Sequence, residues 1–175
     1  MGINILAAVY GTTTAGNNVT TICQNLVDNG EDDIPVNNTT MGSDPDVGVV
    51  KSFGIVYTDQ QLNNGNPIAL ACQENATLDL MPTQASTSLQ QSLAPAGSIQ
   101  VLDAVYGTGT NGNNVTAICQ AFVNQGNLVI PVNNAVMGPD PNVGVVKSFG
   151  ILYSVSGTVF ALACQENTNL TLITS

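Results

Sequence analysis

The chain has 175 residues, of which 43% are hydrophobic, enough to bury one or two modest cores. It contains two lysines, no arginine, no histidine and twelve acidic residues, so its formal net charge is −10. Nucleic acid is excluded as a partner because phosphate binding needs clustered cations, and anionic membrane surfaces are disfavoured for the same reason. Without histidine or arginine there is neither a Ser-His or Cys-His nucleophile nor a bidentate anion clamp.

The chain is a tandem repeat, because residues 37–55 return almost letter for letter as residues 133–151. We assign residues 1–80 to the first repeat module, residues 81–98 to a linker and residues 99–175 to the second module. The linker is rich in Pro, Thr, Ser, Gln and Ala. Its length allows separate domains, a docked pair related by a pseudo-twofold axis, or exchange of strands between the modules.

Each module begins with a predicted buried strand, residues 3–10 and 99–106, that ends at a glycine. An amphipathic helix follows over residues 18–29, with Asn17 or Asn18 as its N-cap residue, and the second module repeats it. Its apolar stripe comprises Val19, Ile22, Cys23, Leu26 and Val27 in the first module and Val115, Ile118, Cys119, Phe122 and Val123 in the second.

Further strands are predicted downstream of the helix. Ile34-Pro35-Val36 reads as a short edge strand, because proline lacks a ladder donor. Residues 49–57 alternate so that Phe53, Ile55 and Tyr57 share one face, and the next strand does the same. The predicted fold class is mostly β, with two homologous antiparallel β-sheet or sandwich modules, each carrying one short amphipathic helix.

The four cysteines occupy equivalent places in the two modules. Cys23 and Cys119 lie on the helix stripes, and Cys72 and Cys164 lie on the inward face of a late strand. We predict disulfides Cys23–Cys72 and Cys119–Cys164, each closing a loop of about 50 residues and contributing roughly 4 kcal/mol. Four buried free thiols are the alternative, whereas metal binding would require closer spacing or histidines.

Nine acidic residues lie in the first module and three in the second. Only three charged positions are present in both modules. They are Asp44 with Asp140, Lys51 with Lys147, and Glu74 with Glu166. We expect Asp44 and Lys51 to form an exposed ion pair that holds the loop between them, and a purely structural role for these charges is the alternative.

The loop from Asn37 to Asp46 is the predicted ligand site, because amides, carboxylates and hydroxyls are the groups that bind sugar hydroxyls. The candidate residues are Asn37, Asn38, Asp44, Lys51, Asn133, Asn134, Asp140 and Lys147. The same oxygen ligands suit calcium, although no EF-hand or glycine nonapeptide spacing is present, so we expect no cofactor. A carboxylate pair such as Asp44 with Glu74 could support hydrolysis, but the D-T-G signature is absent and we expect no enzyme.

A resemblance rests on the ordered motifs Val-Tyr-Gly, Ile-Pro-Val-Asn-Asn and Gly-x-Asp-Pro-x-x-Gly-Val-Val-Lys, followed by a strand that ends in tyrosine and a final strand containing glutamate. This order resembles the small domain at the C-terminus of some DnaJ-like proteins, which also occurs in uncharacterised fungal and bacterial proteins. The resemblance covers both modules. The shared motifs are not catalytic and imply no functional residues.

The composition favours a secreted or cell-surface protein, because few residues are charged and the polar ones are mainly Asn, Thr, Gln and Ser. Membrane insertion is not expected, since no apolar run approaches the roughly 18 residues that span a bilayer. The predicted function is a non-enzymatic, lectin-like binding protein with two equivalent loop sites, whose partner is a glycan or a surface protein. The alternative is a structural or self-assembling surface protein that forms homo-oligomers.

Overall fold

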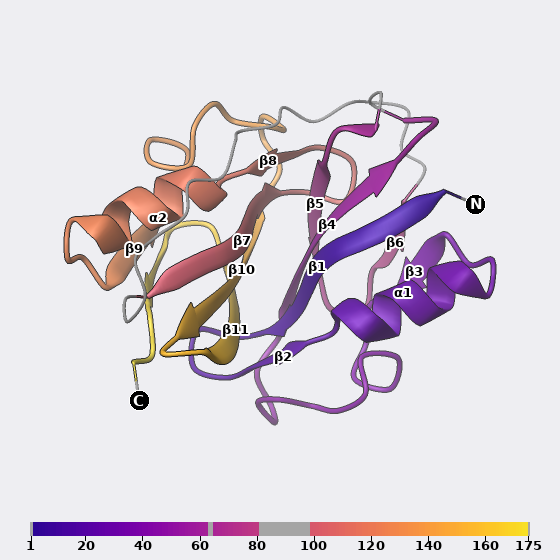
Figure 1. The fold of residues 1–175 in the computed structure, drawn as a ribbon, viewed down its shortest axis with the longest axis horizontal. Coiled ribbons are helices and arrows are strands. Elements are labelled where there is room, and N and C mark those ends of the chain that lie inside the picture. The colour runs from indigo at the N-terminus through magenta and orange to yellow at the C-terminus, as the bar shows by residue number, and fades with distance from the viewer. Residues whose placement is uncertain (1, 63–64, 81–98, 175) are drawn as a thin grey trace.

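The computed structural model describes residues 2–62, 65–80 and 99–174, and it consists of two similar β-rich halves (Figure 1). The predicted linker, residues 81–98, lies outside the described residues. The first half contains β1 (Ile3–Gly11), β2 (Gly16–Asn18), α1 (Thr20–Asp28), β3 (Asp33–Pro35), β4 (Ser52–Asp59), β5 (Ile68–Gln73) and β6 (Thr77–Asp79). The second half contains β7 (Gln100–Gly107), β8 (Gly112–Asn114), α2 (Thr116–Asn124), β9 (Val129–Val132), β10 (Ser148–Val155), β11 (Thr158–Gln165) and β12 (Thr168–Thr171). The predicted fold class is confirmed.

Each half forms one four-stranded antiparallel sheet, with strand order β2-β1-β4-β5 in the first half and β11-β10-β7-β8 in the second. A two-stranded sheet accompanies each of them, β3 with β6 and β12 with β9. Among the described residues, every sheet is built from strands of one half. The two halves are therefore docked against each other without exchanging strands.

The outer face of each large sheet carries the large apolar side chains. In the first half Tyr10, Phe53, Ile55, Tyr57 and Leu70 are almost completely buried and form one cluster. Helix α1 and the β3–β6 sheet cover this face, because Val19, Val27, Ile34 and Leu78 belong to the same cluster. The second half repeats the arrangement under α2. The predicted core face is confirmed, and each half has its own core on the side away from its partner (Figure 1).

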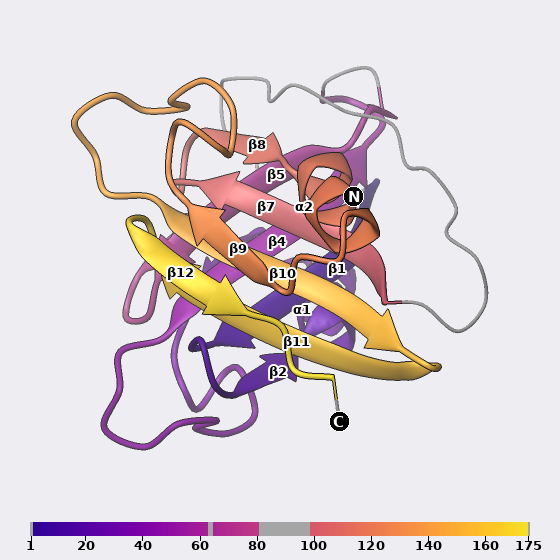
Figure 2. The ribbon, with the colours of Figure 1, turned by 90° about the vertical axis from the view of Figure 1, so that its left-hand side faces the viewer.

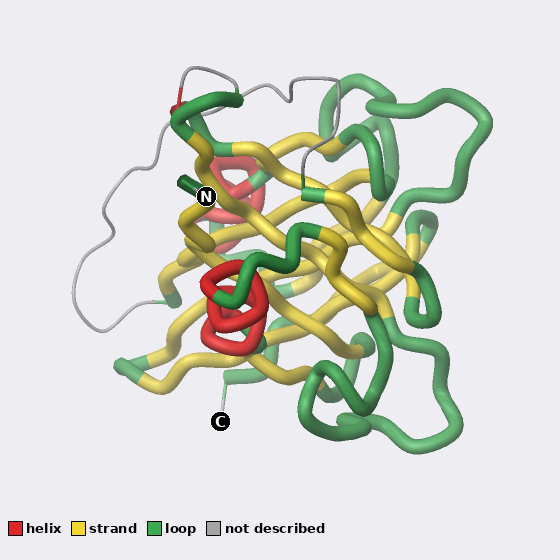
Figure 3. Tube along the Cα trace, turned by 90° about the vertical axis from the view of Figure 1, so that its right-hand side faces the viewer, coloured by secondary structure: helices red, strands yellow, loops and turns green. Residues whose placement is uncertain are grey.

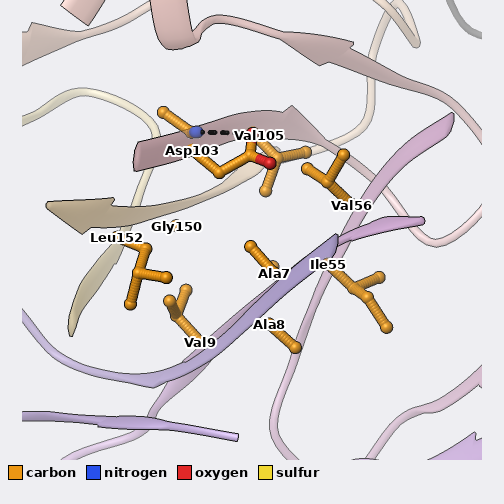
Figure 4. Close-up of a pocket in the computed structure, with 11 residues that line it drawn as sticks. Ala7, Ala8, Val9, Ile55, Val56, Asp103, Val105, Gly150 and Leu152 are labelled. Carbon is orange, nitrogen blue, oxygen red and sulfur yellow. Dashed lines mark hydrogen bonds between the residues drawn. The ribbon is translucent and has the colours of Figure 1, made fainter. Parts of the chain in front are cut away.

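The inner faces of the two sheets meet in a layer of small residues. Ala7 and Val9 pack with Leu152, Ala161 and Ala163 of the other half, and Val105 packs with the first half. Figure 4 shows Ala7, Val9, Val105 and Leu152 lying about this interface. The space left between them is only about 10 Å³, which is at most enough for a single water molecule. The centre of the interface is therefore tightly packed and has no room for a ligand.

The edges of the two sheets are also joined. The Ala71 amide of β5 donates a hydrogen bond to the Thr108 carbonyl at 3.0 Å, and the Ala163 amide of β11 donates to the Thr12 carbonyl at 2.9 Å. The edge strand β5 thus binds the turn between β7 and β8, and the edge strand β11 binds the turn between β1 and β2. Figure 2 shows β2 lying beside β11. These bonds satisfy edge-strand amides that would otherwise be free to pair with another chain.

Both helices are nine residues long, shorter than predicted. The predicted N-cap asparagine is wrong, because Val19 is the N-cap residue and provides no capping hydrogen bond. Side chains of the first helix instead accept hydrogen bonds from backbone amides beside the bulge in β1. The Ala8 amide donates to Thr20 Oγ1 at 2.9 Å, and the Ile5 amide donates to Gln24 Oε1 at 2.8 Å. Neither helix has the length and hydrophobicity needed to cross a bilayer, among the residues described.

All four cysteines are free thiols, so the predicted disulfides Cys23–Cys72 and Cys119–Cys164 are wrong for this structure. Each predicted pair does lie in one hydrophobic cluster. Burial raises the pKa of the Cys23, Cys72 and Cys164 thiols to about 12 and raises the pKa of Cys119 as well. A thiol that stays protonated behaves as a small apolar core residue, because only the thiolate is a good nucleophile.

Candidate functional site

Two long loops lie at the same end of the sandwich (Figures 2 and 3). The first loop comprises residues 37–51 and leads into β4, and the second loop comprises residues 133–147 and leads into β10. The sequence pattern predicts that a strand begins at residue 49, but β4 begins at Ser52. Val49 and Val50 therefore belong to the first loop rather than to the sheet.

Each loop begins with a turn that an asparagine side chain closes. Asn37 Oδ1 accepts a hydrogen bond from the Thr40 amide at 2.9 Å, and Asn133 Oδ1 accepts one from the Ala135 amide at 3.0 Å. Such asparagine turns mimic a backbone turn. Met41 and Met137, which follow, are fully buried and anchor the loops on the two cores.

Beneath each loop lies a buried lysine that pairs with two carboxylates. Lys51 Nζ lies 2.7 Å from Asp44 Oδ1 and 3.6 Å from Glu74 Oε2. Lys147 Nζ lies 2.9 Å from Asp140 Oδ1 and 3.2 Å from Glu166 Oε2. The predicted pair therefore forms, but the expectation that it is exposed is wrong, because both lysine side chains are only 3% exposed.

The protonation states follow from these contacts. The hydrogen bond with Lys51 holds the pKa of Asp44 below its usual range, and the same hydrogen bond raises the pKa of Lys51 against the opposing effect of burial. For Lys147 burial acts to lower the pKa, but hydrogen bonds to Asp140 and Glu166 outweigh it and raise the pKa. Both lysines are charged at neutral pH, and neither is poised to act as a base.

A tyrosine and an asparagine complete the network in each half. Tyr10 Oη donates a hydrogen bond to Asn38 Oδ1 at 2.8 Å, and Asn38 Nδ2 donates to Asp44 Oδ2 at 3.2 Å. In the second half Tyr106 Oη lies 2.8 Å from Asn134 Oδ1 and 3.0 Å from Glu166 Oε2. Burial, reinforced by nearby carboxylates, raises the pKa of Tyr10 to about 12. These hydroxyls stay neutral and serve as hydrogen-bond donors.

A glutamate that follows β5 or β11, Glu74 or Glu166, bonds to the lysine at the C-terminal end of each loop. Glu74 Oε2 accepts a hydrogen bond from the Lys51 amide at 2.7 Å, and the Glu74 amide donates to the Lys51 carbonyl at 3.0 Å. In the middle of the loop Asp46 Oδ2 accepts from Thr12 Oγ1 at 2.8 Å. Both ends and the middle of the first loop are thus held by hydrogen bonds.

The structure brings the sequence-predicted residues together, and their polar groups bond within each loop. In the first half Asn37, Asn38, Asp44 and Lys51 bond to one another or to nearby backbone and side chains. Asn133, Asn134, Asp140 and Lys147 do the same in the second half. The described residues contain no group of three His, Cys, Asp or Glu side chains suited to a metal ion, and the Asp44 oxygens already face Lys51 and Asn38.

What the loops expose instead is valine. Val47, Val49 and Val50 are 85%, 46% and 64% exposed, and their counterparts Val143, Val145 and Val146 are 84%, 44% and 61% exposed. Our sequence reasoning missed these residues because it assigned Val49 and Val50 to a strand. The signal was present: Val-Gly-Val-Val occurs between the Asp-Pro turn and the lysine in both modules. We call residues 47–50 and 143–146 the valine tips.

Comparisons with protein-family models, curated proteins and solved structures find no match to this chain.

Proposed function

We propose that the protein is a non-enzymatic binding protein that engages a protein partner through its two valine tips. The observation that carries this proposal is the pair of tips itself, where six valines are exposed in nearly the same proportions in both halves. Exposed apolar patches on folded proteins mark interaction surfaces. Burying one valine side chain contributes roughly 1.5–3 kcal/mol, so the two tips together can support a stable contact.

The network below the tips supports this function by fixing their position. A buried ammonium group held by two carboxylates gives each loop one geometry, which limits the conformational entropy lost on binding. Both tips lie at the same end of the molecule (Figures 2 and 3). A partner that meets both gains avidity, because the second contact is intramolecular once the first has formed.

The charge around the loops selects the chemistry of the partner. Four carboxylates, those of Asp44, Glu74, Asp140 and Glu166, contact the two ammonium groups. Asp46 in the first loop adds a fifth carboxylate, so these side chains together carry a net charge of −3. Both lysines are buried, so these side chains present no accessible cation. A partner surface with apolar residues flanked by Lys or Arg is complementary to this end, whereas a second copy of this chain or an anionic membrane would meet like charge.

Glycan binding at the loops has less support, because the amides and carboxylates expected to hold sugar hydroxyls already bond within the loops. Self-assembly, the alternative function inferred from the sequence, uses the same valines and is separated from partner binding by the experiment below. The secreted or cell-surface location stays a prediction.

The test measures binding of a fluorescent peptide of alternating lysine and leucine to the protein by anisotropy, beside a matched glutamate–leucine peptide. We expect the lysine peptide alone to bind, and the double variant Val47→Ser/Val143→Ser to bind it at least about tenfold more weakly at unchanged melting temperature, because these side chains are exposed. Val159→Ser, which changes an exposed valine on β11, is the control and should bind like the parent.

Equal binding of the lysine peptide by the parent and the double variant would show that the tips are not the binding surface. Light scattering of the protein alone tests self-assembly. Oligomers that form in the parent and are absent in the double variant would show that the valine tips serve self-assembly rather than partner binding.

A further inference from the structure

A cleft of about 190 Å³ opens beside the first loop, where the two halves meet. One wall comes from the first half, where the β1–β2 turn, the start of β4 and the end of β5 lie together. The opposite wall comes from the end of β11 and the start of β12 in the second half. Neither half alone contains the cleft, so it exists only because the halves are docked.

The polar groups in the cleft are uncharged. They include the amides of Gln73 and Gln165 and the hydroxyls of Thr13 and Thr168, one amide and one hydroxyl from each half. Within the described part of the chain, these four side chains make no hydrogen bond to protein. The cleft therefore presents donors and acceptors that a ligand can use without first breaking a protein contact.

The remaining lining is apolar or neutral. Val49 and Val50 form one side, and both are substantially exposed. Cys164 also lines the cleft, but burial raises the pKa of its thiol to about 12, so it carries no charge at neutral pH. The cleft thus combines hydrogen-bonding groups with an apolar surface and contains no ionised side chain.

We infer that this cleft binds a neutral, polyhydroxylated ligand, of which a single sugar residue is the biological example. A sugar ring has hydroxyls at its rim, which amides and hydroxyls bind, and C–H groups on its faces, which pack on apolar side chains such as Val49 and Val50. The volume suits one ring rather than a larger molecule, because pockets for drug-sized ligands occupy roughly 300–1,000 Å³. The site differs from the loop site expected from the sequence, whose polar groups are already bonded.

Other ligand classes fit the cleft less well. An anion would find no cationic side chain in the lining and would meet a chain of net charge −10. A cation would find no carboxylate in the lining. A wholly apolar ligand would cover the Gln73, Gln165 and Thr168 polar groups without replacing their bonds to water, which costs free energy.

The cleft shares Val49 and Val50 with the first valine tip, but Val47 and Val143 do not line it. Variants at these two valines therefore test partner binding alone, and variants at Gln165 and Thr168 test the cleft alone. Thr168→Ala copies the first half, where Ala76 occupies the equivalent position, so that substitution is compatible with the fold.

The experiment is saturation-transfer NMR of the intact protein with glucose, galactose, mannose, N-acetylglucosamine and their β-linked disaccharides. We expect transfer to at least one of these sugars, with a loss of about tenfold in affinity in Gln165→Ala/Thr168→Ala. Asn169→Ala is the matched control, because Asn169 is an exposed neighbour of Thr168 outside the lining. Its affinity should equal that of the parent, and circular dichroism verifies that each variant is folded.

Absence of transfer to every sugar would overturn the inference. Transfer that persists at parental strength in the folded double variant would also overturn it, since the sugar would then bind elsewhere. A variant with Gln165→Trp, which fills the cleft from an exposed position, provides a second check: it should abolish transfer, and retained transfer would contradict the site.

Discussion

Asp103 is a charged residue of the second half that has no charged counterpart in the first half. It lies in β7 at the inner face of the sandwich, beside Val105 (Figure 4), where the first half has Ala7. Its Oδ1 accepts hydrogen bonds from Thr116 Oγ1 at 2.9 Å and from the Ala104 amide at 3.0 Å. Burial nevertheless dominates and raises the pKa of this carboxyl to about 6.

The raised pKa of Asp103 predicts that the protein is more stable at pH 5 than at pH 7. Between about pH 4 and pH 6 the folded protein holds this proton and the unfolded chain does not, so the free energy of unfolding falls as the pH rises through this window. The full effect is of the order of 2 kcal/mol. Urea midpoints measured between pH 4.5 and 7.5 give the slope.

The matching variant is Asp103→Ala, which copies Ala7 of the first half. It should remove most of the slope. Asp44 and Asp140 do not interfere, because lysine contacts lower their pKa values and their contribution to stability is lost only at more acidic pH. A parent whose stability is flat from pH 4.5 to 7.5 would show that Asp103 is well solvated.

At the scale of structural elements, the loops are ordered by a buried charge rather than by secondary structure. The first loop contains neither helix nor strand, yet Lys51 below it is 3% exposed and contacts Asp44 and Glu74. Removing one partner of a buried pair leaves the other charges without compensation, which is far more costly than losing an exposed pair. The lysine therefore acts as the anchor of the loop.

Lys51→Met is expected to release the first loop and to lower the melting temperature by roughly 5 °C or more. Hydrogen exchange should show faster exchange of amides in residues 37–51, with the second loop in the same molecule as the internal reference. Asp46→Asn copies Asn142 of the second half and should leave both measurements near the parent. Unchanged exchange in Lys51→Met would show that Met41 and the asparagine turn hold the loop without the ion pair.

At the scale of the whole molecule, the halves dock closely because two glycines meet at the centre of the interface. A Cβ atom added to Gly54 would lie 3.2 Å from the Gly150 Cα atom and 2.5 Å from Val105 Cγ1. A Cβ atom added to Gly150 would lie 3.2 Å from the Gly54 Cα atom and 2.5 Å from Val9 Cγ2. Any side chain at either position would push the sheets apart.

Gly54→Ala and Gly150→Ala should each destabilise the protein by about 1–3 kcal/mol, because overpacking a dense interior forces backbone shifts. Gly2→Ala is the control, since a Cβ atom there has no neighbour closer than 3.8 Å. Chemical denaturation gives the free energies. If Gly54→Ala proved as stable as Gly2→Ala, the sheets would be able to separate at little cost and the cleft between the halves would not be a fixed site.

Much of the local structure was determined by the sequence alone. The tandem repeat, the two helices, the central strands and their buried faces follow from side-chain periodicity, which depends only on neighbouring residues. The sequence also predicted the pair of Asp44 with Lys51, because only three charged positions recur in both modules. The contact between Lys51 and Glu74 was not predicted.

The tertiary structure decided what depends on contacts between distant residues. Whether Lys51 is exposed or buried depends on Glu74, 23 residues away in the chain, and whether Val49 is in a strand or exposed depends on where pairing with β1 begins. The two cysteines of each half lie in one core yet are free thiols. The spacing of cysteines along the chain does not determine whether a disulfide forms. The cleft was beyond any local pattern, because its two walls come from different modules and meet only when Gly54 packs on Gly150.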